Sequence, residues 1–388
     1  MTGREGCALR RAVDRTLTMN AMLSLFPAQS SLGGDKPANL MAAARALNPH
    51  LGRGRTLDRA LVSQTMTLCF GATDAEGGWL WRDAYDAIEL AVVLQMRRLA
   101  PQLARLEDAP AQIAALLAGL NALTLTHTRR SEEQVALDQF STPPELAAIV
   151  VAAAQVRPGD RVLEPSAGTG IIAVMAEACG ATLTLNEIAE TRGGLLDLAF
   201  PSATRRRVDG AQVHNIEGAG GYHAVATNPP YQHLEAHLAS ALHALADGGR
   251  LSAVVPTRLF DDAAALRRLG TDARLVGMIA FPPRAYTKHG TSVETGLLVM
   301  DRASPDLAIQ PRTIQADDLA SLAGIAAALE PRPNAQARAF RTAPVVSLVQ
   351  PRARALSSKS DRCAFLAGAA PVAYMPRTDA AAGEDVGL

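Results

Sequence analysis

The sequence predicts an α/β protein with a doubly wound sheet of seven strands, preceded by a helical region. Strand-like and helix-like segments alternate over residues 135–302, as they do in parallel βα units. A glycine turn, Gly168-Thr-Gly170, separates the first strand from the helix that follows it. The apolar run Tyr222–Thr227 ends in Asn228-Pro-Pro-Tyr231, and a strand stops where proline cannot donate a ladder hydrogen bond.

The individual strands are predicted from short apolar runs that end in glycine, proline or polar residues. Ser141 or Thr142 caps the helix that opens this unit, and Glu145 lies near the positive end of its dipole. A helix is predicted over 171–179 after the glycine turn, and another over 233–246 after the fourth strand. We expect the seven strands at residues 160–164, 181–185, 205–208, 222–227, 250–255, 275–281 and 292–300.

The remainder of the chain divides into three segments. Residues 1–55 contain several prolines and glycines and more basic than acidic residues, which predicts a flexible basic arm. This arm is either a solvated tail or a contact to a phosphate backbone. Apolar residues at three- and four-residue spacing predict a helical domain over 56–134. Residues 303–388 form a C-terminal extension of unknown role with a helical segment near 319–329.

Composition limits the classes of partner. The formal net charge of the 388 residues is zero, so no overall field draws the chain to nucleic acid. The four cysteines are scattered without metal-ligand spacing, which predicts a reduced, cytoplasmic protein without a metal site. No apolar run approaches the roughly 20 residues of a membrane span, so we expect no membrane contact.

The corner formed by Asn228, Pro229, Pro230 and Tyr231 is the main functional feature of the sequence. Its two prolines make the chain stiff and rich in carbonyl groups. The Asn228 side-chain oxygen and the Pro229 carbonyl are able to accept hydrogen bonds from both N–H groups of a planar amine, while the Tyr231 ring offers a face for stacking. An ordinary turn is the alternative interpretation. The glycine turn about 60 residues upstream favours the amine-binding interpretation.

At these residues the sequence resembles the amino methyltransferases that use S-adenosylmethionine (AdoMet), whose signature is this tetrapeptide. The resemblance covers residues 140–302 and includes the order of the motifs, with the glycine loop before the tetrapeptide, as in one class of adenine-specific DNA methyltransferases. It implies a Rossmann-like seven-stranded fold, AdoMet as the cofactor, and methyl transfer to the exocyclic amine of a nucleobase. The region before residue 135 is also faintly similar to bacterial strawberry-notch-type proteins.

The resemblance implies a cofactor-binding role for residues along one edge of the sheet. Glu164 corresponds to the carboxylate beside the cationic end of the cofactor. Glu187, at the end of the second strand, is expected to bind the ribose hydroxyls, and Asp209 is expected to accept from the adenine amine. The full set of implied cofactor-binding residues is Phe140, Thr142, Glu164, Ser166, Gly168, Gly170, Glu187, Asp209 and Asn228.

The resemblance also implies the catalytic and substrate-binding residues. The implied catalytic residues are Asn228, Pro229, Pro230 and Tyr231. Tyr231 and Tyr286 are expected to stack on the target base, with Phe281 as the second candidate for the loop aromatic. One position departs from the family pattern, because His223 stands where the family usually has an acid, which puts the role of that acid in doubt.

The expected partner is DNA, with adenine as the leading substrate. The C-terminal extension is short for a recognition domain, so a helicase or another protein partner is a candidate source of target recognition. Three alternatives stay open: methylation of RNA, methylation of a protein glutamine, and a non-catalytic methyltransferase-like module of a helicase or mobile-element system.

Overall fold

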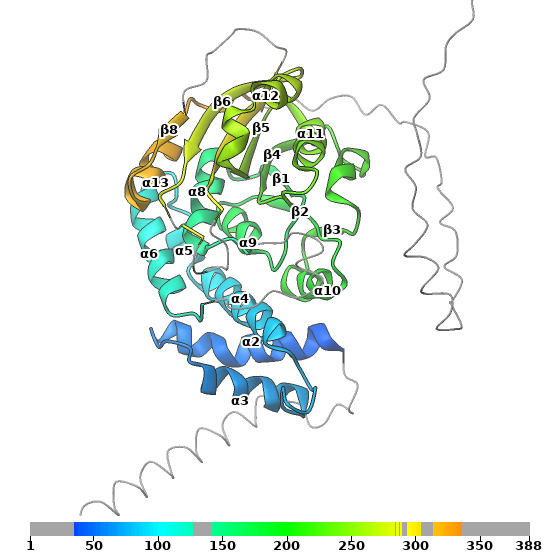
Figure 1. The fold of residues 1–388 in the computed structure, drawn as a ribbon, viewed down its shortest axis with the longest axis vertical. Coiled ribbons are helices and arrows are strands. Elements are labelled where there is room, and N and C mark those ends of the chain that lie inside the picture. Colours follow the sequence, from blue (N-terminus) through cyan, green and yellow to red (C-terminus); the bar gives the residue numbers. More distant parts are fainter. Residues whose placement is uncertain are drawn as a thin grey trace, which may run out of the picture. The chain divides into compact units, whose positions relative to one another are not determined.

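The computed structural model describes residues 35–126, 141–283, 285–286, 288, 293–303 and 313–334. The chain divides into two compact units, Met1–Phe340 and Arg341–Leu388, and every described residue belongs to the first. That unit is built on one mixed sheet with helices on both faces (Figure 1). The predicted α/β class, a doubly wound Rossmann-like sheet, is therefore confirmed.

The sheet has the strand order β3-β2-β1-β4-β5-β7-β6-β8. β7 runs antiparallel to both β5 and β6, and all the other pairs are parallel. The strands are β1 Arg161–Glu164, β2 Thr182–Asn186, β3 Thr204–Arg206, β4 Tyr222–Thr227, β5 Leu245–Pro256, β6 Ala273–Ala280, β7 Thr295–Arg302 and β8 Thr313–Gln315.

The predicted count of seven strands is wrong, because the described residues form eight. The extra strand, β8, pairs in parallel with the outer side of β6. All three of its residues are exposed, so it carries no alternation of apolar and polar side chains for sequence analysis to detect. After β8, the helix expected near 319–329 is confirmed as α13, Leu319–Ala327, which buries Leu322 and Ala326 in the core. The packed unit thus continues beyond residue 302.

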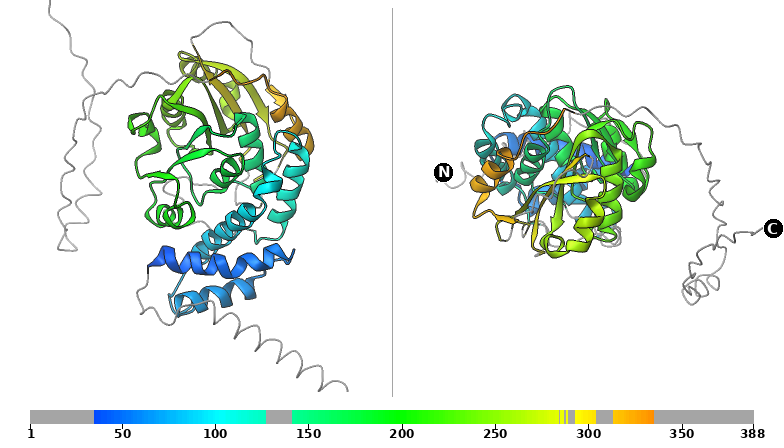
Figure 2. Two further views of the ribbon diagram at one scale, coloured as in Figure 1. Left: turned by 180° about the vertical axis from the view of Figure 1, so that it is seen from behind. Right: turned by 90° about the horizontal axis from the view of Figure 1, so that it is seen from above.

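Helices surround the sheet, and short 3-10 helices follow β3 and β5. Figures 1 and 2 show α2 and α3 beside each other, with α4 leading from them towards the sheet. The remaining elements are α2 Lys36–Gly52, α3 Arg59–Phe70, α4 Trp81–Arg98, α5 Ala100–Leu103, α6 Pro110–Ala122, α8 Pro144–Ala154, α9 Ile171–Ala178, α10 Glu190–Ala199, α11 Leu234–Ala244, α12 Ala263–Leu269, η1 Gly210–Asn215 and η2 Thr257–Asp261.

Helix α2 corrects the prediction of a flexible arm over residues 1–55. Residues 36–52 are helical, and they bury Leu40 and Leu47 completely. Pro37 is compatible with this helix because it lies in the first turn, where the missing N–H has no intrahelical partner to lose. Residues 1–34 lie outside the described part of the chain.

The two faces of the sheet contact different hydrophobic clusters because successive strand side chains alternate. Ala224 and Val254 face the larger cluster, which also contains the buried residues of α2, α4, α6, α8, α9 and α13. Val225 and Val255 face the smaller cluster, which α11 and α12 cover. The helices before residue 126 therefore share a continuous core with the sheet.

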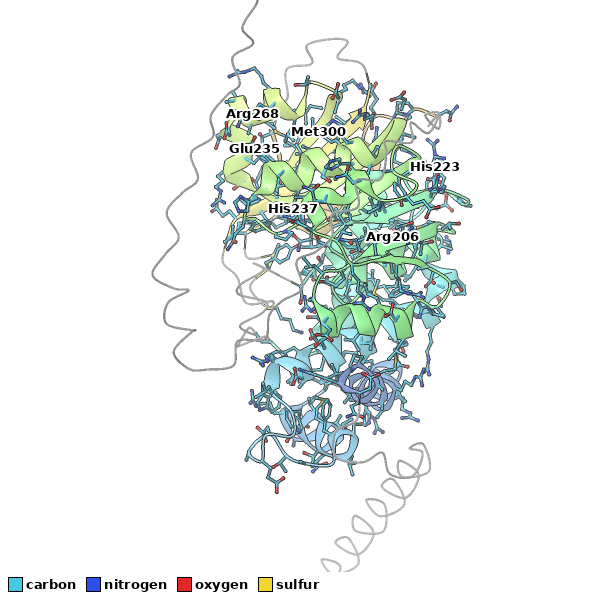
Figure 3. The ribbon with its side chains drawn as sticks, turned by 90° about the vertical axis from the view of Figure 1, so that its right-hand side faces the viewer. Arg206, His223, Glu235, His237, Arg268 and Met300 are labelled. Carbon is cyan, nitrogen blue, oxygen red and sulfur yellow. The ribbon has the colours of Figure 1, made fainter. Side chains whose placement is uncertain are left out.

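Ion pairs join elements on the second face. Figure 3 labels Glu235 of α11 and Arg268 of α12, whose side chains pair at 2.7 Å. His223, at the start of β4, accepts the Arg161 N–H through Nδ1 at 2.8 Å and lies 3.5 Å from Asp160. This histidine, where the family usually has an acid, contacts the amino end of β1, away from the carboxyl ends of the strands.

Candidate active site

The candidate site lies where the carboxyl ends of β1, β2 and β4 meet, and two pockets open along this edge. The outer pocket is lined by Pro165, Ser166, Asn186, Glu187, Ile188, Asp209, Gly210, Pro230, Gln232, His233 and His237. The inner pocket is lined by Glu89, Thr142, Glu164, Ser166, Ala167, Gly168, Thr169, Ile171, Ile172, Arg192 and Asn228. The pockets adjoin at Ser166. The outer pocket has a volume of about 170 Å³ and the inner pocket about 30 Å³, so the outer pocket can hold the larger part of a ligand.

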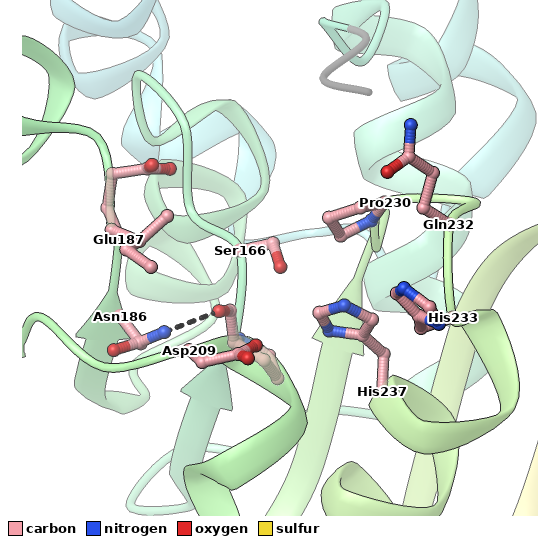
Figure 4. A pocket seen from close by; sticks show the side chains of 11 residues that line it. Ser166, Asn186, Glu187, Asp209, Pro230, Gln232, His233 and His237 are labelled. Atoms are coloured by element: carbon pink, nitrogen blue, oxygen red, sulfur yellow. Dashed lines mark hydrogen bonds between the residues drawn. The ribbon is translucent and has the colours of Figure 1, made fainter. Parts of the chain in front are cut away.

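One buried asparagine holds the strand ends together. The Asn186 amide nitrogen donates to the carbonyls of Pro165 at 2.8 Å and Val208 at 2.9 Å, and its oxygen accepts the Val208 N–H at 2.9 Å. Figure 4 shows the first of these bonds at the outer pocket. No role was predicted for Asn186 from the sequence. A polar side chain in a largely apolar strand is nevertheless a signal, because buried polar groups are nearly always hydrogen-bonded.

Gly168 and Gly170 have different reasons to be glycine. Both have a left-handed backbone, with φ of 56° and 91°. A Cβ at Gly168 would meet no described atom nearer than Arg192 Nη1, at 3.7 Å, so the loop backbone is open to the inner pocket. A Cβ at Gly170 would lie 2.3 Å from Phe200 Cε2. Gly170 is therefore required for packing, and it lines neither pocket.

Glu187 closes the glycine loop from the end of β2. Its Oε2 accepts the Gly168 N–H and its Oε1 accepts the Ala189 N–H, both at 2.8 Å. The side chain is 2% exposed and lines the outer pocket, as Figure 4 shows. These bonds hold the carboxylate at the pocket, where its oxygens are acceptors of the kind that a ligand hydroxyl requires.

Glu164 is a buried carboxyl at the inner pocket. It is 3% exposed, and its Oε2 has no hydrogen-bond partner among the described residues. Burial, and then the nearby negative charge of Glu187, raise the pKa of Glu164 well above its ordinary value. A buried oxygen without a donor is costly in the ligand-free protein, and a bound cation or N–H donor would remove that cost.

Asn228 lies at the rim of the inner pocket. Its Nδ2 donates to the Thr142 hydroxyl at 3.2 Å, which turns the amide oxygen to the other side. The side chain is partly exposed. Pro230 lines the outer pocket, Pro229 is buried behind it, and Tyr231 is partly buried. The tetrapeptide therefore borders both pockets.

Neither of the two expected loop aromatics, Tyr286 and Phe281, exposes a ring face for stacking in this conformation. Tyr286 is 2% exposed, and burial followed by the neighbouring Tyr231 raises its pKa well above the ordinary value. Phe281 is 5% exposed and packs in the larger hydrophobic cluster. Neither residue lines the two pockets. Phe140, expected at the methionine part of the cofactor, lies outside the described residues.

Asp209 and His237 both line the outer pocket. Asp209 caps η1 by accepting the Ala211 N–H at 2.9 Å, and it is exposed to the pocket. The buried His237 Nδ1 has no hydrogen-bond partner among the described residues. Burial lowers the pKa of His237, although Asp209 acts in the opposite direction. His233, four residues before His237, also lines this pocket (Figure 4).

Two charged residues of the inner pocket were not expected from the sequence. Glu89 belongs to α4, and Arg192 belongs to α10; they are 6% and 5% exposed. Within the described ranges, no group of three or more His, Cys, Asp or Glu side chains is arranged to hold a metal ion. Nor does any helix of those ranges have the length and apolar character to cross a membrane.

Neither a protein-family model nor a curated protein matches the chain. Among solved structures, it is similar to TrmN from Thermus thermophilus, with 23% identity, TM-score 0.34 and coverage of 41% of this chain and 48% of that one. A modification subunit assigned to a type I restriction enzyme from Vibrio vulnificus has 17% identity, TM-score 0.39 and 52% coverage of both chains. The chain spans about half the length of these two proteins.

A protein from Listeria monocytogenes assigned as a class I S-adenosylmethionine-dependent methyltransferase has 14% identity and TM-score 0.40, with coverage of 73% of this chain and 92% of that one. These identities and TM-scores are low. The functional argument therefore rests on the residues of the site.

Proposed function

We propose that the protein transfers a methyl group from AdoMet to the exocyclic amine of a nucleobase, with adenine in DNA as the first candidate. The observation that carries this proposal is the position of Asn228. Asn228 lies between the end of β4 and the two prolines, and it lines the same pocket as Glu164 and Gly168. An acceptor for an amine and a cradle for a cationic cofactor are thus adjacent.

The residues of both pockets fit AdoMet. The unpartnered Glu164 Oε2 suits a cationic group, and the open backbone at Gly168 admits a close approach. We assign the amino-acid end of the cofactor to the inner pocket and its adenosine to the outer pocket, with Glu187 binding the ribose hydroxyls and Asp209 the adenine amine. When bound, AdoMet supplies an electrophilic methyl group on a positively charged sulfur.

The tetrapeptide activates the amine by accepting its hydrogen bonds. An exocyclic amine is a weak nucleophile because its lone pair is delocalised into the ring. The Asn228 oxygen and the Pro229 carbonyl accept from the two N–H groups, which favours a pyramidal nitrogen with an available lone pair. Thr142 holds the Asn228 amide in the orientation this requires. No strong base is needed before attack.

Base stacking is assigned to Tyr231 first and Tyr286 second. In duplex DNA the target base must leave the helix to reach the site. Tyr231 is partly exposed beside the rim of the pocket, whereas the buried Tyr286 has to turn outwards to stack. Phe281 is the weakest of the three candidates, because its ring packs in the core.

Asn228→Ala tests the proposal. We expect turnover to fall by about 10²–10³-fold, the size of effect seen when one oriented hydrogen-bonding group is removed, with little change in AdoMet affinity. Asn215→Ala is the matched control, since Asn215 is an exposed asparagine on η1. Equal loss of turnover and AdoMet affinity in Asn228→Ala would show that Asn228 has only a structural role.

The substrate is identified with labelled AdoMet and separate pools of DNA, RNA and cell protein, digested to find the modified unit. Label in deoxyadenosine supports the first candidate, and label in RNA or in glutamine supports one of the alternatives. AdoMet binding without label in any pool favours the non-catalytic module, for which a helicase or other protein partner is proposed. The formal net charge of zero gives this alternative some support, because nucleic-acid affinity depends on phosphate contacts.

A further inference from the structure

Helix α4 brings a buried carboxylate from the N-terminal helices into the inner pocket. Glu89 is 6% exposed and lines that pocket together with Gly168 and Glu164. Its Oε2 accepts the Thr169 hydroxyl at 2.8 Å, and its Oε1 accepts the Ser141 hydroxyl. The Thr169 bond holds the carboxylate against the glycine loop, which lies 80 residues further along the chain.

A buried guanidinium lies beside this carboxylate. Arg192 of α10 donates from Nε and Nη2 to Asp86 Oδ1, at 3.1 and 3.0 Å, and its Nη2 is 4.0 Å from Glu89 Oε2. Arg192 also lines the inner pocket. Its Nη1 lies close to the glycine loop, because it would be the nearest described atom to a Cβ added at Gly168. The pocket thus presents a negative and a positive group side by side.

Burying these charged groups costs more free energy than a purely structural contact requires. Removing each ion from water costs several kcal/mol, and apolar residues of similar volume would usually serve packing as well or better. Asp86 and Glu89 both lie beside Arg192, at 3.0 and 4.0 Å, and Glu164 is a second carboxyl that lines the pocket with Glu89. Burial, and then Glu89, raise the pKa of Asp86 despite the opposing effect of Arg192. A ligand with charged groups of its own would give the two buried charges at the pocket, Glu89 and Arg192, a function beyond packing.

We propose that Glu89 and Arg192 form a subsite for the zwitterionic α-amino-acid end of AdoMet, with Glu89 facing the ammonium group and Arg192 facing the carboxylate. The N-terminal helices are then part of the cofactor site. This inference rests on the proposed use of AdoMet, and it adds binding residues that the tetrapeptide resemblance does not imply.

The test measures binding of ligands that differ only at the amino-acid end. AdoMet carries both charged groups, decarboxylated AdoMet lacks the carboxylate, and 5′-methylthioadenosine lacks the whole amino-acid end. For Glu89→Gln we expect roughly a 10–100-fold loss of AdoMet affinity, the range for one charged hydrogen bond, with 5′-methylthioadenosine affinity unchanged. Glu177→Gln is the matched control, because Glu177 also pairs with α4, through Arg97 at 2.8 Å, but lies outside both pockets.

Each outcome separates this inference from the proposed function. Unchanged AdoMet affinity in Glu89→Gln, with wild-type protein binding AdoMet, overturns the subsite and leaves the proposed function intact. Equal weakening of AdoMet and 5′-methylthioadenosine also overturns it, because Glu89 would then act through the fold. Wild-type protein that binds neither ligand overturns the proposed function and the subsite together.

A measurement on wild-type protein keeps the test valid if Glu89→Gln fails to fold. We expect AdoMet to bind at least tenfold more tightly than decarboxylated AdoMet, because Arg192 faces the carboxylate. Equal affinities would overturn the role of Arg192. In Arg192→Lys, which keeps the charge opposite Asp86 but loses the planar fork, we expect the preference for AdoMet to shrink while decarboxylated AdoMet binds as in wild type.

Discussion

Replacing each glycine of the loop by alanine separates the packing role of Gly170 from the ligand-facing role of Gly168. At Gly170, the new Cβ would lie 2.3 Å from Phe200 Cε2 and 3.3 Å from Leu196 Cδ2, and the backbone φ is 91°. Phe200 is 1% exposed, so its ring has little room to move. At Gly168, φ is 56° and the Cβ position is open.

These distances set the expected magnitudes. A left-handed backbone costs an alanine roughly 1–2 kcal/mol, and overpacking a filled core costs about 1–3 kcal/mol more. Gly170→Ala should therefore lower the free energy of unfolding by about 2–5 kcal/mol. Gly168→Ala has only the backbone term and should lower it by about 1–2 kcal/mol, but its methyl group enters the inner pocket and should weaken AdoMet binding.

Urea unfolding gives the free energies, and calorimetric titration with AdoMet gives the affinities. Gly119→Ala in α6 is the control: no described atom lies within 4 Å of that Cβ, and φ is not positive there. It should raise stability by roughly 0.5–1 kcal/mol. The reasoning is refuted if Gly170→Ala is as stable as wild type, or if Gly168→Ala loses stability but binds AdoMet normally.

Two further predictions concern buried charges. Because the pKa of Glu164 is raised, the folded ligand-free protein keeps a proton above pH 4.5 that the unfolded chain has lost. Its free energy of unfolding should therefore fall as pH rises from 4.5 through the folded-state pKa, and urea titrations across this range should show a flatter dependence in Glu164→Gln. Arg250 and Asp301 form a fully buried pair at 2.6 Å between β5 and β7. Asp301→Ala should lower the free energy of unfolding by about 3–5 kcal/mol without changing AdoMet affinity, and a smaller loss would mean that Arg250 finds another partner.

The edge of the sheet that carries the site was predictable from sequence, because its geometry follows from short-range rules. Parallel βα units place the carboxyl ends of their strands along one edge. Glu164 ends a strand, Glu187, Asp209 and Asn228 come shortly after one, and the structure brings all four to the two adjoining pockets. Which of the two glycines faces the ligand was not predictable, since it depends on Phe200, 30 residues further along the chain.

The sequence did not show that α4 contributes to the inner pocket, because the residues that α4 contacts there are far from it along the chain. Arg192 and Asp86 are 106 residues apart, and no periodicity connects them. A local signal did exist: Glu89 follows Tyr85 by four residues and precedes Val92 by three, so it lies on the apolar face of α4. A carboxylate at such a position has to be paired or to bind a ligand, because burying it alone is too costly.

The charge of the inner pocket also bears on product release in the proposed reaction. Methyl transfer removes the positive charge of the sulfonium, so the product carries one positive charge fewer than the cofactor. Glu89 lines this pocket, where hydrogen bonds from Ser141 and Thr169 hold its carboxylate. A carboxylate fixed there interacts more favourably with the cationic cofactor than with a product that has lost the sulfonium charge. The N-terminal helices, through Glu89, would thus aid release of the product as well as capture of the cofactor.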